Sequence, residues 1–232
     1  MKHTVVHGFI LAHALLLASG GALAAAPFTG TNAQDADAVF FKFQADGSTQ
    51  VDLHSYGYGG GVTADGTSVT QGGFDTLLTL YDDTGHLISA LEPDGYFNDD
   101  GAGVDTDTDT GLALDALFQG VLPAGTYWLA LTESPNYGPD YLGNAFSWDG
   151  LVNPAGFFGC SQGYFCDYQG NNRTGQWALD IQGVVSAETK TRDDVRAEFA
   201  PPSYVPEPAT LALFSLGLAA MPRFRTRRRA GG

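Results

Sequence analysis

Five aspartates between residues 98 and 111 are the first candidates for chemistry in this chain of 232 residues. Asp99 and Asp100 are adjacent, and Asp105, Asp107 and Asp109 follow at alternate positions. Carboxylates at such spacing can converge on one hard cation, and calcium takes most of its protein ligands from carboxylate and carbonyl oxygens. The sequence leaves two interpretations open, which are a calcium-binding loop and a solvated Asp/Thr loop that binds nothing.

An EF-hand is excluded for this aspartate segment. A loop of that kind opening at Asp105 needs glycine at its sixth position and glutamate at its twelfth, and the chain has Thr110 and Ala116 there. Glycine-rich stretches lie earlier in the chain, but no tandem nonapeptide repeat accompanies them, which excludes a calcium β-roll. A calcium site in this segment would therefore have to be of another type.

Cys160 and Cys166 are the only cysteines, and an N-terminal export signal, described below, takes the chain out of the reducing cytoplasm. We expect them to form a disulfide, because thiols close in sequence oxidise in that environment. Two cysteines without a nearby histidine do not make a zinc site. The ring is small, so we expect the bond to shape its loop more than to stabilise the whole domain.

Ser161 lies between these cysteines in a Gly-x-Ser-x-Gly segment, the pattern of a hydrolase nucleophile elbow. That elbow needs a strand before it and a helix after it, whereas this serine lies in an aromatic loop. Beyond the export signal only His54 and His86 remain as histidine bases, and each lies in a predicted strand. We therefore expect no enzymatic activity.

Aromatic side chains are numerous in the segments rich in Gly, Asn and Pro. They are Tyr56, Tyr58, Tyr96, Phe97, Tyr137, Tyr141, Trp148, Phe157, Phe158, Tyr164, Phe165 and Tyr168. Exposed rings beside Asn and Asp can stack on sugar faces, as they do on lectin-like surfaces. The alternative is that the rings fill the ends of the domain as small satellite cores, and we favour that alternative.

Short alternating apolar runs separated by Gly, Asp and Asn predict strands, and no segment of useful length has a helical period. The predicted strands are Ala38–Phe43, Gln50–Tyr56, Thr76–Tyr81, His86–Leu91, Ala116–Phe118, Thr126–Leu131 and Gln176–Ile181. The turn residues Asp82–Gly85 predict a hairpin between the third and the fourth. Such a series of strands predicts an all-β fold, an antiparallel β-sandwich resembling a jelly roll.

The first 24 residues have the features of a secretory signal peptide. Lys2 precedes an apolar run from Phe9 to Ala18, and Ala22 and Ala24 provide a small-x-small cleavage site. An uncleaved membrane anchor is the alternative, but the apolar run is short for a membrane span. We expect export followed by cleavage.

Three features follow one another at the C-terminus. Pro206, Glu207 and Pro208 precede an apolar segment at residues 209–221, for which we expect a short helix. A basic group follows, made of Arg223, Arg225, Arg227, Arg228 and Arg229. The apolar segment is shorter than the roughly 20 residues that cross a bilayer upright, and the arginines would remain cytoplasmic. We expect a transient stop in the inner membrane.

This arrangement at residues 205–229 resembles the PEP-CTERM sorting signal. The resemblance implies recognition by exosortase, a transpeptidase-like membrane enzyme of Gram-negative bacteria that make exopolysaccharide. It also implies that Pro206, Glu207 and Pro208 form the processing motif of a substrate and that the arginines form the basic stop. An ordinary C-terminal tail anchor is the alternative, which the short apolar span disfavours.

A second resemblance lies within residues 74–127. Phe74–Asp82 with Gly85, Asn98–Gly101 and Leu122–Tyr127 are similar to segments of the bacterial pre-peptidase C-terminal domain found on exported proteins. The resemblance implies a sandwich that serves as a non-catalytic adhesive or accessory module. Insertions at residues 57–73 and 153–172 depart from the family pattern, so no loop function is carried over.

Charge is distributed unevenly along the chain, whose net charge is −15. Residues 25–204 keep 25 of the 26 acidic residues and 5 of the 11 basic ones, so this part has a net charge of about −20. That sign argues against a nucleic-acid partner. We expect a signal peptide at 1–24, a β-sandwich at 25–185, a charged linker at 186–204 and the sorting signal at 205–229.

These expectations describe an exported structural or adhesive protein of a Gram-negative cell surface or exopolysaccharide matrix. It would be held in the inner membrane only while exosortase processes it. A carbohydrate-binding module is the alternative function, and it would depend on calcium if the aspartate segment binds that ion. Exosortase and exopolysaccharide are the expected partners, and calcium is the one cofactor that the residues suggest.

Overall fold

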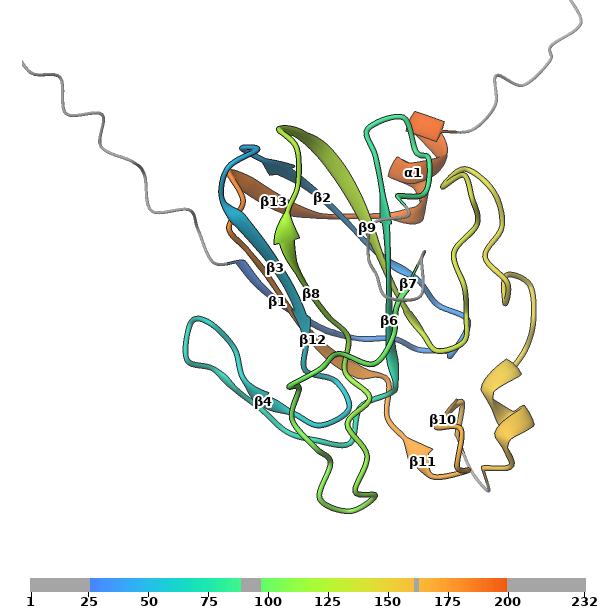
Figure 1. The fold of residues 1–232 in the computed structure, drawn as a ribbon. Coiled ribbons are helices and arrows are strands. Elements are labelled where there is room, and N and C mark those ends of the chain that lie inside the picture. Colours follow the sequence, from blue (N-terminus) through green and yellow to red (C-terminus); the bar gives the residue numbers. More distant parts are fainter. Residues whose placement is uncertain (1–25, 89–96, 161–162, 200–232) are drawn as a thin grey trace, which may run out of the picture.

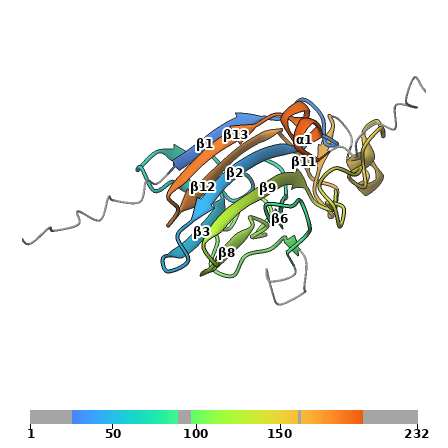
Figure 2. The same ribbon diagram turned by 90° about the horizontal axis from the view of Figure 1, so that it is seen from above.

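A computed structural model describes residues 26–88, 97–160 and 163–199 (Figure 1). In these ranges the chain forms two antiparallel sheets that pack face to face, as the view from above in Figure 2 shows. The predicted all-β antiparallel sandwich is therefore confirmed. The predicted signal peptide, the predicted sorting tail and its apolar segment lie outside the described residues. Within those residues, no helix is long and apolar enough to cross a membrane.

The two large sheets have four and five strands. In spatial order the first contains β1 (Ala26–Thr31), β12 (Gln176–Gln182), β3 (Gln50–Ser55) and β8 (Leu117–Val121). The second contains β13 (Ser186–Lys190), β2 (Val39–Ala45), β9 (Gly125–Glu133), β6 (Thr76–Tyr81) and β7 (Phe97–Asn98). Neighbouring strands far apart in sequence, such as β1 and β12, make the core depend on long-range pairing.

Smaller elements lie outside the two large sheets. They are the two-stranded ribbons β4 (Gly61–Val62) with β5 (Ser68–Val69) and β10 (Phe165–Cys166) with β11 (Asn172–Arg173), the 3-10 helix η1 (Pro154–Phe158) and the helix α1 (Arg192–Phe199). The insertions that depart from the family pattern contain β4, β5, η1 and β10, so they lie outside the two large sheets.

Most predicted strands agree with the structure. The predictions for β2, β3, β6, β9 and β12 agree within one or two residues at each end, and Ala116–Phe118 overlaps β8. The predicted strand His86–Leu91 is not a regular strand where it is described, because His86 and Leu87 form only isolated bridges. The turn before it is present, since the Asp82 amide donates to the His86 carbonyl at 2.9 Å.

The main core lies between the two sheets and follows from alternation along the strands. Phe41 and Phe43 of β2 and Leu129 and Leu131 of β9 are buried in it, together with Trp177 of β12. Successive side chains of a strand point to opposite faces. The residues between these positions must therefore face the outer side of the five-stranded sheet.

That outer side is also apolar, and a second core covers it. Phe40 of β2, Trp128 of β9 and Tyr81 of β6 are buried there against Val195 and Phe199 of α1. The Phe199 ring meets the Trp128 ring edge-on, with the centroids 5.2 Å apart. Strands β6 and β9 are consequently buried on both faces, which explains why successive residues such as Leu77 and Leu78 of β6 and Tyr127–Leu131 of β9 are apolar.

The predicted linker at residues 186–204 is wrong for residues 186–199. Strand β13 pairs with β2 through five residues, from Ser186 opposite Gln44 to Lys190 opposite Phe40, and α1 covers the outer face of the same sheet. The many charged residues suggested a solvated tether, but they lie on an edge strand and on the outward side of a short helix. The folded domain therefore extends to Phe199, and the predicted boundary at residue 185 is too early.

Candidate functional site

Three carboxylates meet at one end of the five-stranded sheet. Asp75 immediately precedes β6, and Asp99 and Asp100 immediately follow β7. Strands β6 and β7 are antiparallel neighbours, so the start of one and the end of the other lie at the same edge. Each residue places one carboxylate oxygen so that the three oxygens lie within 4.8 Å of one another. We call Asp75, Asp99 and Asp100 the acidic cluster.

Strand β9 holds the acidic cluster in place through the residue that follows it. Thr76 of β6 pairs with Glu133, the last residue of β9. The amide of Ser134 donates to the Asp75 carbonyl at 2.9 Å, and its hydroxyl donates to Oδ2 of Asp99 at 3.0 Å. One serine therefore contacts both segments that carry the carboxylates, which restricts how far they can move apart.

Two oxygens of the acidic cluster are buried and lack hydrogen bonds. In the described part of the chain, Oδ1 of Asp75 and Oδ1 of Asp99 have no hydrogen-bond partner. Asp75 is only 6% exposed, while Asp99 is half-buried and Asp100 is exposed. Buried polar atoms are almost always paired, so these two oxygens require an explanation.

Burial and mutual repulsion both act on the acidic cluster. Burial, and then the negative charges of Asp99 and Asp100, raise the pKa of Asp75 well above its usual range. Burial, and then the charge of Asp100, raise the pKa of Asp99 to about 6. Carboxyl groups arranged in this way can relieve their repulsion by taking up a proton or by sharing a cation.

The five aspartates predicted to surround calcium do not converge on one point. Asp99 and Asp100 belong to the acidic cluster, but Asp105 and Asp109 are exposed and are not grouped with them. The third carboxylate beside Asp99 and Asp100 comes from Asp75 and not from the later aspartates that the sequence suggested. Its signals were its position directly before β6, whose residues are all buried, and its place in the segment Phe74–Asp82, which the resemblance groups with Asn98–Gly101.

Asp107 has a structural role instead. Its Oδ2 accepts a hydrogen bond from Arg173 at 2.6 Å, and the two side chains are 1% and 5% exposed. Its Oδ1 accepts from the amides of Asp109 and Thr110, and the Arg173 guanidinium lies 3.8 Å from the centroid of the Tyr58 ring. This ion pair joins the aspartate segment to β11, so Asp107 is not available as a metal ligand.

The predicted disulfide is present between Cys160 and Cys166, whose Cα atoms lie 5.8 Å apart. The Cys166 amide donates to Oε1 of Glu133 at 3.0 Å, which ties the bridge to β9. The amide of Ala155 in η1 donates to Oδ2 of the buried Asp35 at 2.7 Å. Two buried acids thus attach the segment that carries the disulfide to the sandwich.

Some of the loop aromatics are buried, as the satellite-core interpretation predicts, and others are exposed, as a sugar-stacking surface would require. Tyr56, Tyr58 and Phe165 are buried and Tyr141, Trp148 and Phe158 are half-buried, as expected for satellite cores. Tyr137, Phe157, Tyr164 and Tyr168 are exposed, and Phe157 is 88% exposed. Tyr96 lies outside the described residues, as does the side chain of Phe97.

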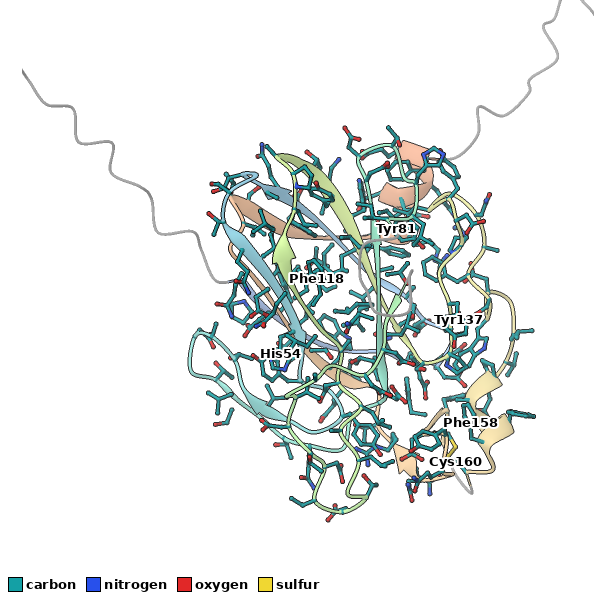
Figure 3. All side chains as sticks on the ribbon, viewed as in Figure 1. His54, Tyr81, Phe118, Tyr137, Phe158 and Cys160 are labelled. Atoms are coloured by element: carbon teal, nitrogen blue, oxygen red, sulfur yellow. A yellow bond between two sulfur atoms is a disulfide. The ribbon has the colours of Figure 1, made fainter. Side chains whose placement is uncertain are left out.

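Of the residues that suggested a hydrolase, the structure describes the two histidines. Figure 3 places His54 on the opposite side of the view from Cys160, the residue before Ser161. His54 lies on β3 with its ring 4.1 Å from that of Tyr56, and its pKa is lowered by burial. His86 is exposed beside Thr84. Ser161 itself lies outside the described residues.

Comparison with known proteins identifies the C-terminal segment. Residues 205–229 match the PEP-CTERM protein-sorting motif. No curated protein matches the chain. The likeness of residues 74–127 to the pre-peptidase C-terminal domain stays a prediction. The motif contains Pro206, Glu207, Pro208 and the five arginines, so the predicted sorting signal is confirmed, and the chain is an exported protein that exosortase sorts to the cell surface.

Proposed function

We propose that the folded domain is a non-catalytic structural or adhesive component of the cell surface or of the exopolysaccharide matrix. Exosortase sorting delivers the chain to that place. The domain contributes a sandwich with a disulfide and a strongly acidic composition. Each of these features suits a protein that must persist outside the cell, where thiols are oxidised and high net charge keeps proteins soluble.

One surface feature carries the adhesive part of the proposal. Large apolar side chains are exposed between residues 151 and 168, and we call this segment, without residues 161 and 162, the apolar loop. Its exposed members are Leu151, Val152, Phe157, Tyr164 and Tyr168. Apolar surface left in water costs free energy, and contiguous groups of it usually mark a contact surface.

The apolar loop is also held firmly by groups beneath it. The disulfide closes it, and Glu133 and Asp35 accept hydrogen bonds from its backbone. A loop that is already ordered loses little conformational entropy when it binds a partner. The exposed rings therefore form a surface suited to adhesion rather than a segment that must fold first.

Carbohydrate binding remains the second candidate, and the exposed tyrosines favour it. Tyr137, Tyr164 and Tyr168 each expose about half of their surface. A tyrosine offers both a flat apolar face and a hydroxyl, and a sugar ring presents the complementary groups. Tyr164 and Tyr168 belong to the apolar loop, so the two candidates share that loop and differ in whether a soluble sugar competes with binding.

Retention on isolated exopolysaccharide and on whole cells tests both candidates. The test variant replaces Phe157, Tyr164 and Tyr168 with alanine, and the control variant replaces Val62 and Val121, which are exposed elsewhere. We expect the first variant to lose at least tenfold in retention and the control to keep it. Release by soluble sugars would select carbohydrate binding. Equal retention of both variants would contradict the proposal.

Sorting is tested separately at the tail. Glu207→Ala should leave the precursor unprocessed in the inner membrane, while Glu188→Ala, a change of the same type on β13, should mature normally. The mass of the protein in the matrix fraction reports both the N-terminal and the C-terminal cleavage. Normal maturation of the Glu207 variant would show that this residue is not needed for sorting.

A further inference from the structure

We propose that Asp75, Asp99 and Asp100 bind one calcium ion in the exported protein. This inference does not depend on the adhesive role, because the acidic cluster lies at the β6–β7 edge of the five-stranded sheet and the apolar loop is a different segment. It differs from the calcium loop that the sequence suggested, since Asp75 joins the site and Asp105, Asp107 and Asp109 do not.

The distances in the cluster suit a single cation. Calcium binds oxygen at about 2.3 to 2.6 Å, so two oxygens on opposite sides of one ion lie up to about 5 Å apart. The three carboxylate oxygens lie within 4.8 Å of one another. All three oxygens can therefore bind one ion with little rearrangement. Because Asp100 is exposed, water can reach the ion on that side and complete its coordination.

A second observation points to a missing positive group at this place. Asp75 is more than nine-tenths buried, and its Oδ1 has no hydrogen-bond partner in the described ranges. A buried carboxylate without a donor or a counter-charge is expensive. Its neighbours in the cluster are carboxylates as well, so the cluster itself contains no positively charged side chain.

The side chains of the domain do not supply the missing charge. Residues 25–204 contain five basic residues, and each forms an ion pair with another acid. The pairs are Lys42 with Glu198, Arg173 with Asp107, Lys190 with Glu188, Arg192 with Asp149 and Arg196 with Asp193. A cation that pairs with the acidic cluster would therefore come from solution.

The chemistry of the ligands and the place of the protein select calcium. Carboxylate oxygens suit hard cations, and Mg²⁺ demands a tighter octahedron and gives up its water reluctantly. Calcium sites of extracellular modules have dissociation constants of about 10⁻⁴ to 10⁻³ M. We expect an affinity in that range.

Two matched variants test the site on the purified exported protein with calcium chloride as the probe. Asp99→Asn with Asp100→Asn removes two proposed ligands, whereas Asp105→Asn with Asp109→Asn removes the same charge from exposed aspartates nearby. Thermal unfolding is measured in EDTA, in calcium chloride, and in sodium chloride of equal ionic strength. Isothermal titration gives the affinity and the number of ions bound.

We expect wild type and the Asp105/Asp109 variant to bind one ion. Their Tm should rise by about 3 to 6 °C at ten times the dissociation constant. The Asp99/Asp100 variant should show no rise, and in EDTA it should unfold at or above the wild-type temperature, because repulsion has been removed. If this variant does not fold, Asp100→Asn alone, at an exposed residue, should weaken binding at least tenfold.

Three results would overturn the proposal. The first is a wild-type protein whose Tm does not respond to calcium. The second is an Asp99/Asp100 or Asp100 variant that keeps the full response. The third is an equal rise of Tm in sodium chloride, which would show general screening of the negative domain rather than a site.

Discussion

Phe199→Ala tests the extension of the folded domain beyond the boundary that the sequence predicted. Phe199 is the last residue of α1 and is 4% exposed. Its ring contacts Trp128 edge-on, and its carbonyl accepts a hydrogen bond from the Tyr141 hydroxyl at 2.9 Å. If α1 belongs to the domain, removal of this ring must destabilise the whole sandwich.

The size of the effect follows from the burial of the side chain. Truncation of a buried phenylalanine to alanine costs about 3 to 5 kcal/mol, from lost transfer free energy and from the cavity that remains. Helix α1 has eight residues, too few to be stable without packing. Val195 is therefore expected to lose part of its burial as well. We expect a loss of about 3 kcal/mol or more, which corresponds to a fall in Tm of about 6 to 12 °C.

Urea unfolding followed by tryptophan fluorescence measures the free energy of unfolding. Trp128 is fully buried against Phe199, so the native emission of the variant should also shift to longer wavelength. Phe157→Ala is the control, because the same change at an 88% exposed ring should alter stability by less than about 0.5 kcal/mol. Equal stability of the Phe199 variant and this control would refute the docking of α1.

Three further predictions concern buried polar groups and the disulfide. Burial raises the pKa of Glu133 to about 9, so the folded protein keeps this proton between about pH 4.5 and 9 while the unfolded chain loses it. In EDTA the free energy of unfolding of wild type should therefore fall over that range, by up to about 1.4 kcal/mol per pH unit from this proton. Glu133→Gln should remove this contribution to the pH dependence of stability, and an unchanged pH dependence would contradict the prediction. Arg173→Met should cost about 3 to 5 kcal/mol in urea unfolding, because it leaves Asp107 buried and unpaired; a loss below about 1 kcal/mol would contradict that reasoning. Replacement of Cys160 and Cys166 by serine should lower stability by about 2 kcal/mol and make the apolar loop the first site of proteolysis; cleavage starting elsewhere would count against this role.

Strand periodicity predicted much of the sandwich because local alternation reflects which face of a sheet is buried. Strand β1 was missed, since Ala26–Thr31 contains a proline and two residues without a large side chain. It lies at the edge of its sheet beside β12, where a proline is tolerated. Strand β13 was missed because its charged residues indicate solvent, and an edge strand keeps much of its surface in solvent.

The candidate site was predicted only in part. The sequence predicted the adjacent Asp99 and Asp100 as metal ligands but did not predict Asp75. The proposed site is assembled from the ends of two strands, and residues brought together in this way follow no characteristic spacing in the sequence. Asp107 resembled its neighbours in sequence. Only its burial against Arg173 separates it from them.

The sequence by itself determined the destination of this protein, because the sorting tail works as a linear signal read by residue type and order. It also determined the all-β class and the disulfide, which depend on local pattern and on short separation. Tertiary structure decided that residues 186–199 belong to the domain, which of the described rings are exposed and which carboxylates meet. These outcomes depend on strand pairing between distant segments, and such pairing decides which charges are brought together without a counter-ion.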